Sequence, residues 1–231
     1  MRPAIILFAR APAPGRVKTR LAGLLGPQGA AELHRAFVSD ALEMLAGFGA
    51  AADVELHTDT HTDAWPQAGV PRKLQREGNL ALRMLHALAG ALEEGRPRAM
   101  IVGSDAPTLP PVHLEMLLAS SADAAFGPCD DGGYYAICCR RMHPEMFRGV
   151  EWSTARALET SECAARACGL TVERGALWFD VDEPADLYRL LRAPLLPRHT
   201  AEWLRGAFSC DPPAPAAWSP CQGRLCQGNN A

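Results

Sequence analysis

Short apolar runs alternate with longer segments of helical periodicity along the first half of the chain. The runs read AIILFA, DVELHT and AMIVGS, and the segments that follow them repeat apolar side chains every three or four positions, over residues 27–45, 79–92 and 111–118. Parallel strands need a crossover between them, which is usually a helix. The alternation therefore predicts an α/β protein with a mostly parallel sheet and helices on both faces, and such sheets bind ligands beyond the carboxyl ends of their strands.

Local signals place the starts of these helices. Asn79 suits the N-cap of the second helical segment, and Pro27 and Pro111 stand where a first helical turn tolerates a missing N–H. After residue 120 the pattern changes, because DAAFGP and GGYYAICC predict two strands joined by the turn CDDGG. A helix over about residues 153–167, strands at LTVERG and LWFDVD, and a short helix over about residues 184–191 are expected to follow.

Length and composition limit the class of protein. The 231 residues suffice for one sizeable core, so we expect a single domain over residues 1–208 and a disordered tail of proline- and cysteine-containing sequence over 209–231. The net charge of −3 argues against a nucleic-acid partner, and no apolar run approaches the roughly 20 residues of a membrane span. We expect a cytoplasmic protein with reduced cysteines, and whether it forms a homo-oligomer is left open.

Charged side chains gather where three predicted strands end. AIILFA runs into a proline and glycine elbow with three cations, AMIVGS runs into one carboxylate, and LWF runs into two more. These residues are Arg16, Lys18 and Arg20, then Asp105, then Asp180 and Asp182. Cations and carboxylates at one edge of a sheet suit a polyphosphate and the hard divalent cation that bridges its oxygens. The loop lacks the glycine and lysine spacing of a P-loop, so side chains are expected to anchor the phosphates.

Each of these motifs also has a structural interpretation. The three cations alone are equally typical of a solvated loop, and Asp105 or one aspartate of FDVDEP can cap a turn or a helix. Two aspartates on alternate positions of a strand point to the same side, however, which favours a shared role in binding.

Two further stretches are candidates for binding the acceptor. CDDGGYY combines carboxylates and flexible residues with tyrosines, and EWST places an indole beside two hydroxyl groups. The candidate substrate-binding residues are Asp131, Gly132, Gly133, Tyr134, Trp152, Ser153 and Thr154. Each stretch also has a structural alternative. The first can be a turn that needs glycine, and the second can be a helix N-cap beside a core tryptophan.

A resemblance to a known family covers about the first 190 residues in order. It rests on FARAPAPGRVKTRLA, LHRAF, EGNLALRM, GSDAPTLP, GPCDDGGYY, EWST and FDVDEPADL. The chain resembles a bacterial family of GT-A-type transferases described as glycosyltransferases associated with radical-SAM and selenium-domain proteins. More distantly, KTRLA and DVDEPADL resemble the 2-phospholactate guanylyltransferases and related nucleotidyltransferases. The resemblance implies a GT-A fold, a Rossmann-like three-layer α/β/α sandwich that binds a nucleotide diphosphate with Mg²⁺ or Mn²⁺.

The resemblance also implies roles for individual residues. The opening cations match the family's phosphate-side motif, and Asp105 matches the metal-binding acidic position of GT-A enzymes. The two aspartates of FDVDEP match the acidic motif that completes the metal site in the nucleotidyltransferases. Asp105, Lys18 and Asp182 are accordingly the expected catalytic residues, and Gly78 and Arg83 lie in the segment expected near the nucleoside. Two departures are the sequence SDA in place of the D-x-D of many glycosyltransferases, and asparagine at residue 79 where the family usually has an acidic residue.

Three functions are consistent with these residues. The first expectation is metal-dependent glycosyl transfer from a nucleotide-activated donor, an NDP-sugar, to a small-molecule acceptor. The alternative is a nucleotidyltransferase, which joins an NTP to a phosphorylated small molecule and releases pyrophosphate. A third hypothesis is a non-catalytic nucleotide-binding partner of a redox or radical enzyme. Three carboxylates beside the phosphates argue against the third hypothesis, because binding alone does not require them.

Overall fold

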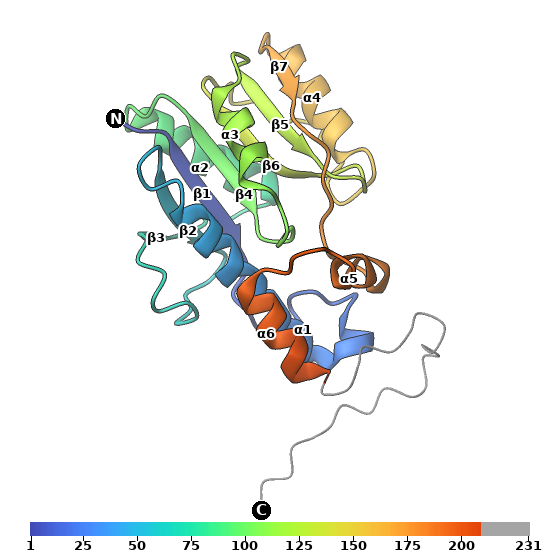
Figure 1. Ribbon diagram of the computed structural model, residues 1–231. Helices are drawn as coiled ribbons and strands as arrows, with labels where there is room; N and C mark the ends of the chain where they lie inside the picture. Colours follow the sequence, from blue (N-terminus) through green and yellow to red (C-terminus); the bar gives the residue numbers. More distant parts are fainter. Residues whose placement is uncertain (209–231) are drawn as a thin grey trace, which may run out of the picture.

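The computed structural model describes residues 1–208, and the expected tail at residues 209–231 lies outside this part of the chain. A seven-stranded sheet is flanked by helices (Figure 1). The strands are β1 (Ala4–Ala9), β2 (Asp53–Thr58), β3 (Arg72–Leu74), β4 (Ala99–Gly103), β5 (Ala124–Pro128), β6 (Tyr134–Cys139) and β7 (Val172–Arg174). The helices are α1 (Ala22–Ala46), α2 (Leu80–Glu93), α3 (Pro111–Ala119), α4 (Ala157–Ala167), α5 (Pro184–Leu191) and α6 (Arg198–Ala207). Within residues 1–208 no helix combines the length and apolar character needed to cross a membrane.

The strand order of the sheet is β3-β2-β1-β4-β6-β5-β7. Strand β1 is parallel to β2 and β4, β2 is parallel to β3, and β5 is parallel to β7, whereas β6 is antiparallel to both of its neighbours. The prediction of a mostly parallel sheet is confirmed, and the predicted hairpin is the β5–β6 pair. Phe8 pairs with His57 on one side and Gly103 on the other, so β1, β2 and β4 end at nearly the same level.

Side chains of the interior strand β1 alternate between two cores. Ile5 and Leu7 of β1 pack in a cluster with side chains of α1 and α3, whereas Ile6 packs in a second cluster with side chains of α2 and α4. A third cluster joins the first half of α1 to α5 and α6. The sheet is therefore covered on both faces, which is the predicted three-layer α/β/α sandwich.

Helices α2 and α3 begin where the local signals predict, and α1 has a kink there. Asn79 accepts a hydrogen bond from the backbone N–H of Leu82 at 3.0 Å and caps α2, and Pro111 is the first residue of α3. Helix α1 is kinked at Gly26, whose φ is 69°, and Pro27 begins the second part of the helix. The expected helix start at residue 27 thus coincides with this kink, and α1 extends one further turn toward its N-terminus.

Other elements differ from the prediction. The helix expected from residue 153 begins at Ala157, because Ser153 has a left-handed φ of 60° that a helix cannot contain. LWFDVD forms no strand and contributes a single bridge between Trp178 and Cys129. Strand β3 and helix α6 are absent from the prediction. Strand β3 is short and exposed, and α6, although amphipathic, has few large apolar side chains and buries only two of its ten residues, so neither stands out as an apolar segment.

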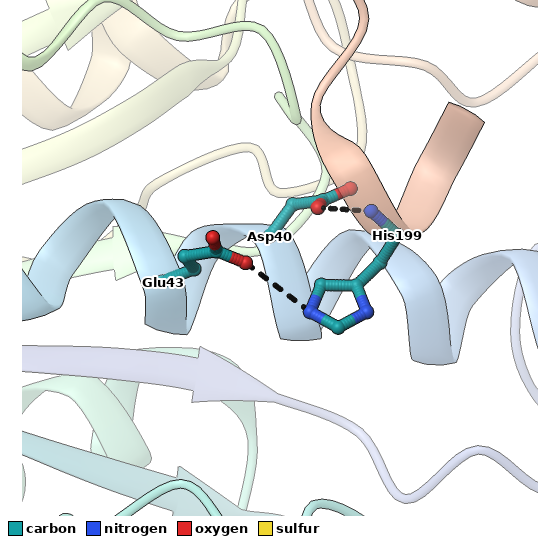
Figure 2. Close-up of side chains that lie close together, drawn as sticks. All are labelled: Asp40, Glu43 and His199. Carbon is teal, nitrogen blue, oxygen red and sulfur yellow. Dashed lines mark hydrogen bonds and ion pairs between the residues drawn. The ribbon is translucent and has the colours of Figure 1, made fainter. Parts of the chain in front are cut away.

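The start of α6 is held by a carboxylate from α1. The N-cap residue of α6 is Pro197, which has no side-chain group for a hydrogen bond. Asp40, which is 4% exposed, accepts hydrogen bonds from the backbone N–H groups of His199 and Thr200, both at 2.8 Å, and from the Thr200 hydroxyl at 2.5 Å. Figure 2 shows the hydrogen bond from the His199 N–H to Asp40, beside the His199 ring, which lies 3.3 Å from Glu43. A buried anion at the first amides of a helix satisfies donors that have no partner within the helix.

Replacing Asp40 with alanine is expected to lower the free energy of unfolding by about 2 kcal/mol, because it removes the cap and leaves buried donors unpaired. Glu43→Ala is the matched control, since it removes a neighbouring carboxylate that is 53% exposed and should cost less than about 1 kcal/mol. Denaturant unfolding of both variants measures the difference. Equal losses would contradict a capping role for Asp40.

A buried carboxylate also lies on β2. The side chain of Glu55 is 8% exposed, accepts a hydrogen bond from His57 Nε2 at 2.9 Å and pairs with Lys73 Nζ at 3.0 Å. The hydrogen bond from His57, together with Lys73, lowers the pKa of Glu55 from 4.5 to about 2, although burial acts in the opposite direction. The folded protein therefore keeps this group ionised at pH values that would protonate it in the unfolded chain.

The stabilising effect of Glu55 is expected in full above about pH 4.5 and should be lost as the pH falls toward 2, because the unfolded chain takes up the proton first. In Glu55→Gln, the free energy of unfolding should therefore fall less steeply over this range than in the wild-type protein. Urea unfolding at a series of pH values gives both slopes. Glu93→Gln, which changes an exposed carboxylate at the end of α2, should retain the wild-type slope, and an unchanged slope in Glu55→Gln would refute the expectation.

Candidate functional site

Loops from distant parts of the sequence meet beyond the carboxyl ends of β1 and β4. The loop after β1 carries Lys18, which has a φ of 45° and follows the buried Val17. The loop after β4 carries Asp105, whose carbonyl accepts a hydrogen bond from the backbone N–H of Val181 at 2.8 Å. Asp182 follows directly and precedes α5. The backbone hydrogen bond thus brings together two acidic stretches that the sequence assigns to one site.

A buried ammonium group joins the two carboxylates. Lys18 Nζ lies 2.5 Å from Asp105 Oδ1, 2.8 Å from Asp182 Oδ1 and 2.8 Å from the carbonyl oxygen of Val181. The side chain of Lys18 is 3% exposed, whereas those of Asp105 and Asp182 are each 43% exposed. The lysine therefore binds one oxygen of each carboxylate from the inside, and each carboxylate keeps a side that faces solvent.

The charges of this cluster are not balanced. Burial lowers the pKa of Lys18, but Asp105 and Asp182 outweigh that effect and raise it above its usual range. Lys18 in turn holds the pKa of Asp105 below its usual range, although loss of solvent opposes the charge there too. Asp180 behaves differently, because burial and neighbouring carboxylates, Asp131 above all, raise its pKa to about 7. The cluster has four carboxylates and one buried ammonium group, so a bound cation would relieve its excess negative charge.

The other two cations of the opening motif lie on the surface. Arg20 is 3.3 Å from Glu183, and both side chains are more than half exposed. Arg16 is exposed, and its guanidinium forms no ion pair within residues 1–208. The three cations therefore differ in exposure: Lys18 is buried in the cluster, and the two arginines are accessible to a ligand. Their role in phosphate binding stays a prediction.

The segment expected near the nucleoside lies beside the end of β1. Gly78 has a φ of 122°, and its carbonyl accepts a hydrogen bond from Arg83 Nε at 2.8 Å. Arg83 also donates to the side-chain oxygen of Gln75 at 3.4 Å, and the Gln75 amide donates to the carbonyl of Ala9 at 3.3 Å. These contacts connect the two residues to the carboxyl end of β1. Nucleoside binding by this segment stays a prediction.

The CDDGG turn packs closely against the segment before α4. Gly132 has a φ of 89°, and a Cβ at this position would lie 2.0 Å from the carbonyl oxygen of Ala155. Asp131 accepts a hydrogen bond from the backbone N–H of Gly133 at 2.7 Å, and a carboxylate oxygen of Asp131 lies within 4.8 Å of one of Asp180. The turn therefore requires glycine at residue 132, as the structural alternative predicts, and it also brings the Asp131 carboxylate close to Asp180.

The aromatic candidates lie mainly in the core. The Tyr134 ring packs against Phe126 and Trp152, with centroid separations of 5.2 and 6.3 Å, and both candidates border the second core cluster. Ser153 and Thr154 are exposed in the loop before α4. The structural alternative of a core tryptophan describes Trp152 well, while substrate contacts by the EWST hydroxyl groups stay a prediction.

Two residues beside the cluster carry almost no signal in the sequence. Cys129 is 5% exposed, and its Sγ lies within 4.8 Å of carboxylate oxygens of Asp131 and Asp180. Burial and these carboxylates raise the pKa of the Cys129 thiol. His34 of α1 is 3% exposed and its Nε2 donates to the carbonyl of Arg10 at 3.0 Å. The position of Cys129 directly before DDGG is the one hint, whereas His34 looks like any core position of an amphipathic helix.

Gly132→Ala is expected to lower the free energy of unfolding by more than about 3 kcal/mol, because the new methyl group meets backbone atoms and the positive φ is itself unfavourable. Gly149→Ala is the matched control, since its φ is 75° and no heavy atom lies within 4 Å of the added carbon. It should cost only roughly 1–2 kcal/mol for the backbone conformation. Chemical denaturation of both variants is the measurement, and equal losses would show that the turn does not depend on its contact with Ala155.

A family model matches the middle of the chain. Residues 40–154 match the family described as "Uncharacterized protein conserved in bacteria" (DUF2064). This range contains Asp105, the CDDGG turn and EWST.

Curated relatives match most of the chain. It is 34% identical over 199 residues to the 3-phospho-D-glycerate guanylyltransferase of Phenylobacterium zucineum, which covers 81% of this chain and 89% of the relative. It is 30% identical over 177 residues to the 2-phospho-L-lactate guanylyltransferase of Haloarcula marismortui, with 75% and 79% covered.

Solved structures agree with the fold. A structure from Desulfovibrio desulfuricans, described as that of a nucleotide-diphospho-sugar transferase, superposes with a TM-score of 0.79 and 32% identity over 90% of this chain and 96% of the other. CMP:2-keto-3-deoxy-manno-octonic acid synthetase superposes with a TM-score of 0.55 and 13% identity over 82% and 96%, a likeness of fold alone. Together these similarities identify a transferase that uses a nucleotide. They support the resemblance to guanylyltransferases and give no support to an association with radical-SAM proteins.

Proposed function

Because the chain belongs to the family that contains the 2-phospho-L-lactate and 3-phospho-D-glycerate guanylyltransferases, we propose that it is a nucleotidyltransferase. It transfers the nucleoside monophosphate group of an NTP, with GTP as the first donor to test, to the phosphate of a small phosphorylated acid. Glycosyl transfer, the first expectation from the sequence, becomes the second candidate. It retains support from the description of one similar solved structure.

The observation that carries this proposal is the pair of carboxylates held by Lys18. Asp105 and Asp182 are fixed on their inner side by the ammonium group and are open on their outer side, at the edge of the sheet where ligands bind. Arg16 and Arg20 lie on the same loop as Lys18 and are exposed. Fixed anions beside accessible cations match a triphosphate that carries a divalent cation.

The acidic residues suit a divalent cation chemically. Asp105, Asp180 and Asp182 offer carboxylate oxygens, which are the ligands that Mg²⁺ and Mn²⁺ prefer, and they would hold the ion. With Asp131 they outnumber the single buried ammonium group, and the raised pKa of Asp180 reflects that excess of negative charge. When bound, the ion would supply positive charge to the triphosphate oxygens and to the departing pyrophosphate.

The reaction is a displacement at the α-phosphorus of the NTP. An oxygen of the acceptor phosphate forms a bond to the α-phosphorus, the bond from the α-phosphorus to the bridging oxygen breaks, and that oxygen leaves with the electron pair as part of pyrophosphate. An ionised acceptor phosphate is itself the nucleophile, so the step requires no general base. Lys18 keeps the carboxylates in position, while Arg16 and Arg20 attract the phosphates. Catalysis thus depends on positioning and charge.

The products distinguish nucleotidyl from glycosyl transfer. Phosphorus NMR of the protein with Mg²⁺ or Mn²⁺, each of the four common NTPs and either 3-phospho-D-glycerate or 2-phospho-L-lactate is expected to show pyrophosphate and a new phosphoanhydride, which depend on acceptor and metal. A parallel panel of NDP-sugars should release no NDP. Release of NDP without pyrophosphate would contradict this proposal and support glycosyl transfer. Nucleotide binding without any turnover would support the non-catalytic hypothesis.

Asp105→Asn should reduce the rate of pyrophosphate release by at least about 100-fold, because it removes a negative charge that would hold the divalent cation while nearly preserving shape. Asp182→Asn should have a similar effect. Glu93→Gln is the matched control, since this exposed carboxylate ends α2 before β4 begins, whereas the site lies where β4 ends, and it should retain the wild-type rate. Circular dichroism and thermal unfolding check that the variants are folded. Full activity of both aspartate variants at limiting metal would restrict these residues to a structural role.

A further inference from the structure

A second set of metal ligands adjoins the two carboxylates held by Lys18. Cys129 Sγ and carboxylate oxygens of Asp131 and Asp180 all lie within 4.8 Å of one another. We propose that these three residues bind a thiophilic divalent cation such as Zn²⁺, and that the bound ion inhibits nucleotidyl transfer by occupying Asp180. The binding site stands on its own geometry, and only the inhibition rests on the function proposed above.

The chemistry of the three ligands favours a soft cation. Mg²⁺ is hard and binds oxygen ligands, whereas Zn²⁺ binds thiolate sulfur at about 2.3 Å and carboxylate oxygen at about 2.0–2.2 Å in tetrahedral geometry. Tetrahedral bonds of these lengths place ligand atoms roughly 3.5 Å apart, so the three side chains need only small rotations to close on the ion. A fourth position remains for water or a phosphate oxygen.

The thiol of Cys129 is buried and aimed at these carboxylates. The residue is 5% exposed, and its sulfur forms no hydrogen bond within the described part of the chain. Cys129 belongs to the first core cluster, but a cysteine that only fills the core needs no charged neighbours, and this sulfur also lies near two acidic side chains. A cation accounts for both features, because it binds the thiolate and compensates the carboxylates. The thiol proton passes to solvent as the ion binds.

The backbone holds the ligands in place without the ion. Cys129 forms a parallel bridge with Trp178, and the N–H of Asp130 donates to the Trp178 carbonyl at 3.1 Å. Asp180 is two residues further along the same segment, so the two ligand-bearing segments are joined by hydrogen bonds. The side chain of Asp130 turns away and pairs with Arg189 of α5. The first aspartate of CDDGG thus anchors the turn, and the second is directed to the sulfur and to Asp180.

Asp180 belongs to both sets of ligands. In the proposed reaction it belongs to the carboxylates that would hold Mg²⁺ or Mn²⁺, and in the present site it is shared with Cys129 and Asp131. First-row divalent ions generally bind in an order that places Zn²⁺ above Mn²⁺, and a thiolate increases that preference. A small concentration of Zn²⁺ is therefore expected to compete with an excess of the catalytic ion.

Direct binding is tested with Co²⁺, which reports a thiolate ligand through its sulfur-to-metal charge-transfer absorption. The full-length, reduced protein is titrated with Co²⁺ in the absence of nucleotide, alongside Cys129→Ser and the matched control Cys163→Ser, which changes an exposed cysteine on α4. The difference between wild type and Cys129→Ser should contain a charge-transfer band equivalent to about one ion, and Cys163→Ser should retain it. Competition with Zn²⁺ should abolish the band. No difference between wild type and Cys129→Ser would overturn the site, whatever the activity of the protein.

Inhibition is tested by titrating Zn²⁺ into the nucleotidyl transfer assay at fixed Mg²⁺, with each variant compared with its own zinc-free rate. Cys129→Ser should require more than about tenfold more Zn²⁺ for half-inhibition, because loss of even an outer-sphere partner of a metal costs about 10- to 100-fold in affinity. Cys163→Ser should match the wild type. If the cobalt band depends on Cys129 but inhibition by Zn²⁺ is the same in Cys129→Ser and the wild type, the inhibitory role is overturned. If no nucleotidyl transfer is detected at all, the proposed function fails while the cobalt result still decides the site.

Discussion

The buried ammonium group of Lys18 is the contact on which the candidate site depends. It lies within 2.8 Å of carboxylate oxygens from two different loops, and its partner Asp182 is 164 residues away in the sequence. Removal of a buried cation would leave two carboxylates facing each other, so the loops after β1 and β4 and the segment before α5 are mutually dependent. The same contact leaves the outer sides of both carboxylates open at the ligand-binding edge of the sheet.

Long-range contacts of a similar kind hold the C-terminal elements against the first helix. Asp40 of α1 caps α6 from across 160 residues, and the third core cluster packs α5 and α6 against the first half of α1. These elements follow the acidic segment that carries Asp180 and Asp182. Packing of α5 and α6 on α1 therefore also fixes the direction in which that segment presents its carboxylates.

Asp180 connects the proposed reaction with its proposed inhibition. It carries excess negative charge among neighbouring carboxylates, which suits a catalytic ion with oxygen ligands. It also approaches Cys129 and Asp131, which together include a ligand atom that suits a softer ion. In our proposal Asp180 is shared by a site for Mg²⁺ or Mn²⁺ and a site for Zn²⁺. Which metal ion is bound therefore controls turnover.

The sequence by itself determined the alternation of strands and helices, the three-layer architecture and the charged residues placed after β1 and β4, whereas the strand expected before Asp180 did not form. Apolar periodicity and capping residues are local properties, so the start of α3 at Pro111 and the cap at Asn79 followed from neighbouring residues alone. The family resemblance added the expectation that Asp105, Asp180 and Asp182 bind a metal ion.

Only the tertiary structure decided how these residues combine. The burial of Lys18 beside two carboxylates separates it from Arg16 and Arg20, although all three stand in one motif. The approach of Cys129 to Asp180 depends on a bridge between two segments about 50 residues apart, and α6 exists as a docked element because Asp40 caps it. The physical reason is common to these cases: distance in space, burial and charge balance arise from long-range packing, and a local pattern of residues does not encode them.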